Sequence, residues 1–193
     1  MGEGEVAVLY VGRVATEKNL RLAVATYHVM QQYCNSVKFI IIGDGPLRAT
    51  LQKEHPDIRF CESLTGERLA THYASADILL FPSTETFGNI TLEALASGLA
   101  VVAFDYAAAR MHIVQGKTGI LVPHGDAGGF VAAAAQLVRE PQLLDTIRQH
   151  ARTAVATVDW QRTVERFETL LVNTHAQHRA VETPSATFHK VAT

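Results

Sequence analysis

Residues 83–98 read STETFGNITLEALASG, and this stretch decides the fold that we expect for the chain. The residues before it, Asp77-Ile78-Leu79-Leu80-Phe81, form a short apolar run that is typical of a buried parallel strand. We expect a helix to begin near Gly88 or Asn89 and to end at Gly98, a residue suited to the left-handed position beyond a helix end. The stretch therefore predicts a strand, a loop and a helix in succession.

Two carboxylates flank the expected start of this helix. Glu85 falls on the loop at the carboxyl end of the strand, and Glu93 falls about one turn into the helix. Ligands bind at this edge of open α/β sheets, and a helix amino terminus there offers free N–H groups to phosphate. Because carboxylates accept hydrogen bonds from hydroxyls, the combination indicates a ligand with both phosphate and hydroxyl groups. Taken alone, the two acids also fit solvated surface positions.

The composition is that of a soluble globular protein of ordinary domain size. The chain has 193 residues, of which 48% are hydrophobic, and a formal net charge of −2, so nothing in it favours a nucleic-acid partner. The two cysteines, Cys34 and Cys61, are far apart, and we expect both to be reduced and buried. The acidic start, without a secretory signal, favours a cytoplasmic protein. No apolar run approaches the roughly 20 residues of a membrane span, and membrane association is not indicated.

Strand and helix patterns alternate along most of the chain. This order predicts an α/β fold, a Rossmann-like doubly wound parallel sheet of about six strands with helices on both faces. We assign residues 1–174 to this domain, including a last amphipathic segment at 160–171, and residues 175–193 to a polar, loose tail. The expected strands cover 6–11, 37–42, 57–61, 77–81, 100–104 and 119–122, and the expected helices cover 17–32, 46–53, 65–74, 88–98, 127–139 and 141–156.

Basic residues follow the first expected strand. Gly12 permits a tight turn there, and Arg13 and Lys18 flank the expected start of the next helix. The planar fork of Arg13 is suited to grip a diphosphate, whereas Lys18 acts as a compact charge. Taken alone, both residues are better explained as solvated side chains that pair with Glu17 or with other surface acids.

The turn Gly43-Asp44-Gly45-Pro46 follows the second expected strand, and it is weak evidence for a dinucleotide site. Arg48 occupies the position of the third glycine of the dinucleotide fingerprint, which also belongs after the first strand, so we reject NAD. A phosphate-binding loop of the lysine-containing type is absent too, since Gly116-Lys117-Thr118 lacks the upstream glycine. We expect a tight loop beneath a ligand, or simply a turn.

Taken in order, these segments resemble a known family. Four segments together look like the carboxyl-terminal, donor-binding domain of family 4 retaining glycosyltransferases of GT-B fold. They are Gly12-Arg13 with Glu17-Lys18-Asn19, the Gly43–Pro46 turn, Tyr73-Ala74-Ser75-Ala76-Asp77 and the Glu85…Glu93 element. The likeness covers about residues 6–167, and residues 85–93 with 102–110 look most like the α-mannosyltransferase branch.

The resemblance implies a role for each matching position. Arg13 and Lys18 would neutralise the diphosphate of the donor, Glu85 would hold a sugar hydroxyl, and Glu93 would accept from the ribose hydroxyls. The backbone of Phe87, Gly88 and Asn89 would line the sugar and phosphates, with Gly12 at the turn and Leu64 beside the base. The implied donor is GDP-mannose or a UDP-sugar. No cofactor and no metal are expected, because the cations and the helix terminus supply the positive field.

The resemblance also implies a partner domain and leaves three functions open. GT-B enzymes carry an amino-terminal, acceptor-binding domain of similar size, which this chain lacks, so we expect the chain alone to be inactive. The segment at 160–171 packs either on that partner or on its own sheet. Besides a transferase, we consider a non-catalytic nucleotide-sugar-binding module and a sugar-nucleotide epimerase half. The role of Arg110-Met111-His112, where many relatives carry a Glu, stays open.

Overall fold

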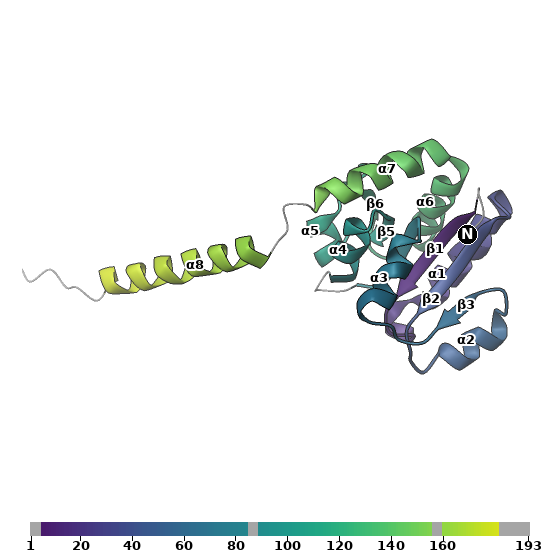
Figure 1. The fold of residues 1–193 in the computed structure, drawn as a ribbon, viewed down its shortest axis with the longest axis horizontal. Helices are drawn as coiled ribbons and strands as arrows, with labels where there is room; N and C mark the ends of the chain where they lie inside the picture. Colours follow the sequence, from purple (N-terminus) through teal and green to yellow (C-terminus); the bar gives the residue numbers. More distant parts are fainter. Residues whose placement is uncertain (1–4, 85–88, 156–159, 182–193) are drawn as a thin grey trace, which may run out of the picture. The chain divides into compact units, whose positions relative to one another are not determined.

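The structure is a computed structural model, and it describes residues 5–84, 89–155 and 160–181. The chain divides into two compact units, residues 1–156 and residues 157–193, and each is described by itself. Within the first unit, six strands form one parallel sheet in the order β3-β2-β1-β4-β5-β6 (Figure 1). The strands are β1 (Val6–Val11), β2 (Val37–Ile42), β3 (Arg59–Cys61), β4 (Ile78–Phe81), β5 (Ala100–Phe104) and β6 (Gly119–Val122).

Helices connect these strands and cover both faces of the sheet, as the alternating pattern predicts. They are the 3-10 turn η1 (Thr16–Lys18) and the α-helices α1 (Leu20–Tyr33), α2 (Arg48–Glu54), α3 (Gly66–Ala74), α4 (Asn89–Ala96), α5 (Ala107–His112), α6 (Ala127–Arg139) and α7 (Pro141–Ala154). The expected fold class is therefore confirmed.

Two hydrophobic cores lie on opposite faces of the sheet, because successive strand residues point to opposite sides. Val8 and Tyr10 of β1 pack with α1 and α6 in one core, whereas Ala7 and Leu9 pack with α3 and α4 in the other. Helix α7 contributes to both cores. The order of the strands reverses between β1 and β4, and such a switch point is where ligands bind in doubly wound sheets.

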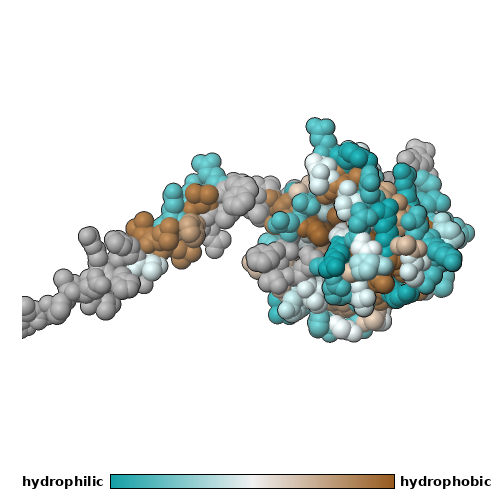
Figure 2. Space-filling view, turned by 90° about the horizontal axis from the view of Figure 1, so that it is seen from below, coloured by the Kyte–Doolittle hydropathy of each residue, from teal (hydrophilic) through white to brown (hydrophobic). Residues whose placement is uncertain are grey.

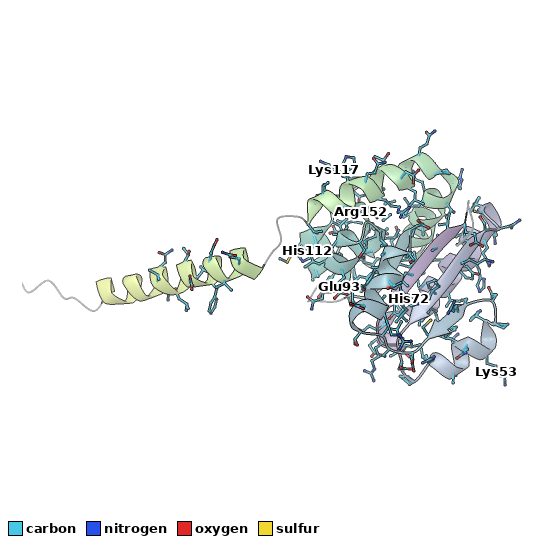
Figure 3. The ribbon with its side chains drawn as sticks, in the orientation of Figure 1. Lys53, His72, Glu93, His112, Lys117 and Arg152 are labelled. Carbon is cyan, nitrogen blue, oxygen red and sulfur yellow. The ribbon has the colours of Figure 1, made fainter. Side chains whose placement is uncertain are left out.

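Helix α7 is anchored at the amino ends of the strands. Arg148 donates from Nη1 to Asp77 Oδ1 at 2.6 Å and from Nε to the Gly98 carbonyl at 3.1 Å. Asp77, which directly precedes β4, also accepts from the Ala7 amide at 2.7 Å. A cleft of about 440 Å³ lies beside this network, next to Arg152, which Figure 3 labels below α7. The amino edge of the sheet is thus tied to α7, and the carboxyl edge carries the loops of the candidate site.

The second unit contains α8 (Trp160–Val181). This helix extends ten residues beyond the expected segment at 160–171 and seven beyond residue 174, where we expected the tail to begin. Its large exposed apolar side chains are Val164, Phe167, Leu170, Leu171 and Val172, which contribute to the brown surface of this helix in Figure 2. Within the described part of the chain, no helix is both long and apolar enough to cross a membrane.

Local differences from the expected elements have simple physical causes. The helix expected from residue 17 is interrupted, because Asn19 takes the left-handed conformation (φ 52°) between η1 and α1. Helix α5 was not expected, and its six residues are too few to show a clear period. Cys34 and Cys61 are free as expected, but half-buried rather than buried, since one follows a helix end and the other ends an edge strand.

Candidate functional site

A cleft of about 490 Å³ opens where the loops after β1, β2 and β3 meet at the carboxyl edge of the sheet. Three residues singled out in the sequence, Gly12, Arg13 and Leu64, contribute to its wall. Asp44, which the sequence did not identify as a binding residue, and Ser63, which belongs to the loop expected beside the base, also line the cleft. The Gly43–Pro46 turn therefore lies beside a cleft, which agrees with the first of its two interpretations, a tight loop next to a ligand.

Backbone hydrogen bonds continue the parallel ladder beyond the strands and build the inner wall of the cleft. The Gly12 amide donates to the Ile42 carbonyl at 3.0 Å, and the Val14 amide donates to the Asp44 carbonyl at 2.9 Å. Gly43 has a φ of +145°, and a Cβ built on it would overlap the Gly12 carbonyl oxygen. The close approach of the two loops therefore requires glycine at position 43.

Asp44 joins the loop after β2 to the loop after β3. Its Oδ2 accepts from the Ser63 amide at 3.0 Å, and its Oδ1 pairs with the Arg48 guanidinium. The Ser63 hydrogen bond, and then the hydrogen bond from Arg48, lower the pKa of the Asp44 carboxyl below its ordinary value. Asp44 is therefore a charged residue that fixes the shape of the cleft mouth.

Arg13 lies at the rim of the cleft with an exposed guanidinium. Its Nη1 donates to Glu17 Oε1 at 3.2 Å, and the two side chains are 64% and 57% exposed. This is the surface pairing that the sequence left open as the alternative. Such exposed pairs contribute only about 0.2–1 kcal/mol, so a ligand with two phosphates competes easily for Arg13. Tyr10 holds the loop in place by donating from its hydroxyl to the Arg13 carbonyl at 2.9 Å.

The start of α4 approaches the same loop. A Cβ built on Gly12 would lie 3.8 Å from Cδ1 of Ile90, which directly follows Asn89, the first residue of α4. Lys18 is half-buried at the end of η1, on the connection from β1 to α1. Three further predicted site residues, Glu85, Phe87 and Gly88, lie outside the described residues.

Glu93 lines a neighbouring pocket and is not among the described residues that line the cleft with Arg13. This pocket, of about 360 Å³, lies between α3 and α4, and Figure 3 labels the exposed Glu93 near the helix that carries His72. Ser63 and Leu64 line the cleft, and Gly66 lines the pocket, so one short loop borders both hollows.

Tyr73 lies beside Glu93 in this pocket. Its buried hydroxyl makes no hydrogen bond of ordinary length within the described part of the chain. Burial raises the pKa of Tyr73, and the nearby charge of Glu93 raises it further. Ser83, which follows β4 at the carboxyl edge, is buried with an unpartnered hydroxyl in the same described residues. Buried hydroxyls normally find a partner, so Ser83 is a polar group available at the carboxyl edge of the sheet.

The loop after β5 adds a rigid element to the same edge. Arg110 donates from Nε to Asp105 Oδ1 at 2.7 Å and from Nη2 to Oδ2 at 3.0 Å. This forked pair lowers the pKa of Asp105 and raises that of Arg110. Ala107, the first residue of α5, has a φ of 35°, which is uncommon for a residue with a Cβ. Partial burial lowers the pKa of His112, whereas Met111 is 78% exposed.

A doubly wound parallel sheet with a cleft at the carboxyl ends of its strands belongs to the class of Rossmann-like nucleotide-binding domains. A family model described as Glycosyl transferases group 1 matches residues 5–140. The chain belongs to this family.

Known proteins of this family and fold are similar over most of the first unit. A GDP-mannose-dependent alpha-mannosyltransferase of Mycobacterium tuberculosis is 37% identical over 142 residues, which are 72% of this chain and 36% of that protein. A solved structure of S. aureus TarM, in complex with fondaparinux, alpha-GlcNAc-glycerol and UDP, superposes with a TM-score of 0.77 at 22% identity, covering 86% of this chain and 35% of that one.

A third similarity is to an isolated domain. The structure of the C-terminal domain of a glycosyl transferase group 1 family protein from Francisella tularensis has a TM-score of 0.71 at 22% identity and covers 80% of this chain and 86% of that one. At these identities the two structures show the fold alone. The chain spans about a third of the length of the curated relatives that it matches.

Proposed function

We propose that this chain is the donor-binding half of a retaining glycosyltransferase of GT-B fold. The enzyme takes a hexose of mannose or glucose type from a nucleoside diphosphate sugar and transfers it to an acceptor hydroxyl. The observation that carries the proposal is the cleft in which Gly12, Arg13 and Leu64 come together at the carboxyl edge of the sheet. Membership of the group 1 family supports this proposal.

The diphosphate is the part of the donor for which the cleft is best equipped. Arg13 exchanges its exposed partner Glu17 for phosphate oxygens, and Lys18 adds a second positive charge from the same loop. When the bond between the sugar and the phosphate breaks, negative charge develops on the departing nucleotide. Preorganised cations and amides stabilise that charge, so this proposal requires no metal ion.

The remaining parts of the donor have separate assignments. The base lies beside Leu64, and the ribose hydroxyls donate to Glu93 in the pocket across the loop of residues 63–66. Glu85 holds a sugar hydroxyl, and the backbone of Phe87, Gly88 and Asn89 lines the sugar and the phosphates. For this arrangement the donor spans both hollows. The acidic groups select hydroxyls, because a carboxylate accepts hydrogen bonds and repels phosphate.

The donor is GDP-mannose or a UDP-sugar. The GDP-mannose-dependent relative supports the first, and the UDP-bound structural neighbour supports the second. The acceptor is bound by an amino-terminal domain that we place elsewhere in the enzyme, since the relatives are about three times as long as the matched region. We assign residues 1–174 to the donor domain and residues 175–193, of which 175–181 belong to α8, to a polar tail, and we expect a cytoplasmic location.

Calorimetric titration of the chain with GDP, UDP, GDP-mannose and UDP-glucose tests this proposal. Arg13→Ala removes charge-assisted hydrogen bonds of about 1.5–3 kcal/mol, so we expect the affinity to fall roughly ten- to a hundredfold. Arg59→Ala, which removes the same charge from the exposed start of β3, is the matched control and leaves the affinity unchanged. Equal affinities of the Arg13 variant and the unmodified chain would remove Arg13 from the site.

Transfer itself requires the complete enzyme. Turnover of the bound nucleotide sugar by the full-length protein supports a transferase, whereas tight binding without turnover identifies a non-catalytic binding module. Release of an epimerised nucleotide sugar would identify the epimerase alternative. The chain alone binds donor but transfers nothing, because the acceptor site is formed by the other domain.

A further inference from the structure

Three metal-binding side chains gather at the edge of the first unit, away from the cleft. They are His28 on α1, His55 at the end of α2 and Asp57 before β3. One ligand atom from each residue lies within 4.8 Å of the other two. The group lies toward the amino end of β3, whereas the cleft lies at the carboxyl ends of the strands. It therefore does not belong to the donor site.

The two imidazoles already have the separation of ligands that share one ion. His28 Nε2 lies 3.1 Å from His55 Nδ1. Two nitrogen ligands at 2.0–2.1 Å from a tetrahedral zinc ion are about 3.3–3.4 Å apart, so a shift of a few tenths of an ångström accommodates the ion. Asp57 Oδ2 lies 3.9 Å from His28 Nδ1, and its side chain is 44% exposed. The carboxylate also contacts the Tyr27 hydroxyl, and a rotation would bring one of its oxygens from the Nδ1 side of His28 toward the two facing nitrogens.

A further pair of residues orients His28. Gln31 donates from Nε2 to the Tyr27 hydroxyl at 2.7 Å, which leaves its Oε1 facing His28 Nδ1 at 3.3 Å. Because an amide oxygen only accepts, this contact favours the proton on Nδ1 and leaves the lone pair on Nε2, directed at His55. Metal-binding histidines typically donate their second ring N–H to an oxygen in this way, which fixes the ring and its tautomer.

We propose that His28, His55 and Asp57 bind a divalent transition-metal ion, with zinc as the best match and water completing the coordination. Two imidazoles and one carboxylate suit Zn²⁺, whereas Mg²⁺ and Ca²⁺ prefer oxygen ligands only. The ion replaces the hydrogen bond between the two imidazoles and ties α1 to the connection between α2 and β3. The site is structural, and it is independent of the proposed transferase function.

Titration of the metal-free full chain with Zn²⁺ tests the proposal. A competing chromophoric chelator reports the dissociation constant, and Co²⁺ reports the coordination through its visible absorption. We expect one ion per chain at this site and a rise in thermal stability on binding. His28→Gln and His55→Gln each raise the dissociation constant at least about tenfold, and Asp57→Asn raises it severalfold. Mg²⁺ causes none of these changes.

The other histidines of the chain supply matched controls. We expect the affinity for Zn²⁺ to be unchanged in His72→Gln, in His150→Gln, in a double variant of His175 and His178, and in Arg13→Ala. Binding that survives both His28→Gln and His55→Gln would overturn the proposal, and so would a complete lack of Zn²⁺ binding at micromolar concentrations. Should His28→Gln fail to fold, the result with His55→Gln decides, because that residue lies at a helix end.

Discussion

Asp44 accepts a hydrogen bond from the Ser63 amide at 3.0 Å, and this contact joins two loops that line the cleft. The two residues follow neighbouring strands, β2 and β3, in a parallel sheet. The carboxyl ends of parallel strands meet at one edge, so a short side chain reaches from one loop to the next. The cleft mouth is thus held by a charged residue as well as by the backbone.

The Asp44 contact gives the folded chain a pH-dependent stability. Its pKa is lower in the folded chain than the ordinary value of 3.8, first because of the Ser63 amide and then because of Arg48. A carboxyl with a lowered folded pKa stabilises the fold above its unfolded pKa, and this contribution is lost as the pH falls through the folded pKa. Urea unfolding measures the difference in the free energy of unfolding between the unmodified chain and Asp44→Asn. We expect this difference to stay constant near neutral pH and to shrink below pH 3.8. A difference in the free energy of unfolding that stays the same at all pH values would contradict this expectation.

Gly43→Ala is expected to damage both the fold and the cleft. Its φ of +145° and the overlap with the Gly12 carbonyl oxygen force the two loops apart, at a cost of about 2–4 kcal/mol. Gly116→Ala is the matched control, because Gly116 also has a positive φ (+69°) but nothing lies within 4 Å of the added carbon. We expect it to cost roughly 1 kcal/mol. Chemical unfolding measures both values, and GDP titration shows lost binding only for Gly43→Ala.

Replacement of Glu93 separates a ribose contact from a diphosphate contact. If Glu93 accepts from ribose hydroxyls, Glu93→Gln weakens GDP binding about five- to twentyfold and leaves pyrophosphate binding unchanged. Arg13→Ala weakens the binding of both GDP and pyrophosphate. Calorimetry with the two ligands on the two variants measures the difference. A loss of pyrophosphate affinity in Glu93→Gln equal to the loss of GDP affinity would exclude the ribose assignment, and Tyr73→Phe controls for disturbance of the pocket.

Arg148→Met tests the anchor of α7. The Arg148 and Asp77 side chains are only 28% and 18% exposed, so removal of the cation leaves a half-buried carboxylate without its charged partner. We expect a loss of about 1–3 kcal/mol in the free energy of unfolding, less than for a fully buried pair. Lys53→Met, at an exposed position of α2, changes stability by less than about 0.5 kcal/mol. Equal stability of the two variants would show that the ion pair contributes nothing.

The sheet was predictable because local and global signals agree along the strands. Apolar runs such as Ala100–Phe104 and Gly119–Val122 have the expected bounds, since each ends where the apolar residues give way to a polar residue or to proline. The positive φ of Gly98 beyond α4 was also expected from its residue type. The left-handed conformation of Asn19 was not expected. It interrupts a helix because of the packing of the loops, which the periodicity of the sequence does not reveal.

The candidate site was predictable only in part. The order of motifs identified Gly12, Arg13 and Leu64, which share one cleft. The contact of Asp44 with Ser63 was not foreseen, because it joins loops nineteen residues apart whose meeting depends on the register of β2 with β3. For the same reason the sequence did not assign Glu93 to a pocket shared with Tyr73, which lies on another helix.

Main-chain amides and carbonyls, together with Gly43, which tolerates no added carbon, form the inner wall of the cleft, and exposed side chains such as those of Arg13 and Ser63 stand at its margin. Changes at the margin therefore leave the architecture beneath them intact. If the proposed donor site is correct, a programme to alter the preferred nucleobase begins with substitutions at the exposed Ser63, whereas Leu64, which is buried in the core, and Gly43 are kept.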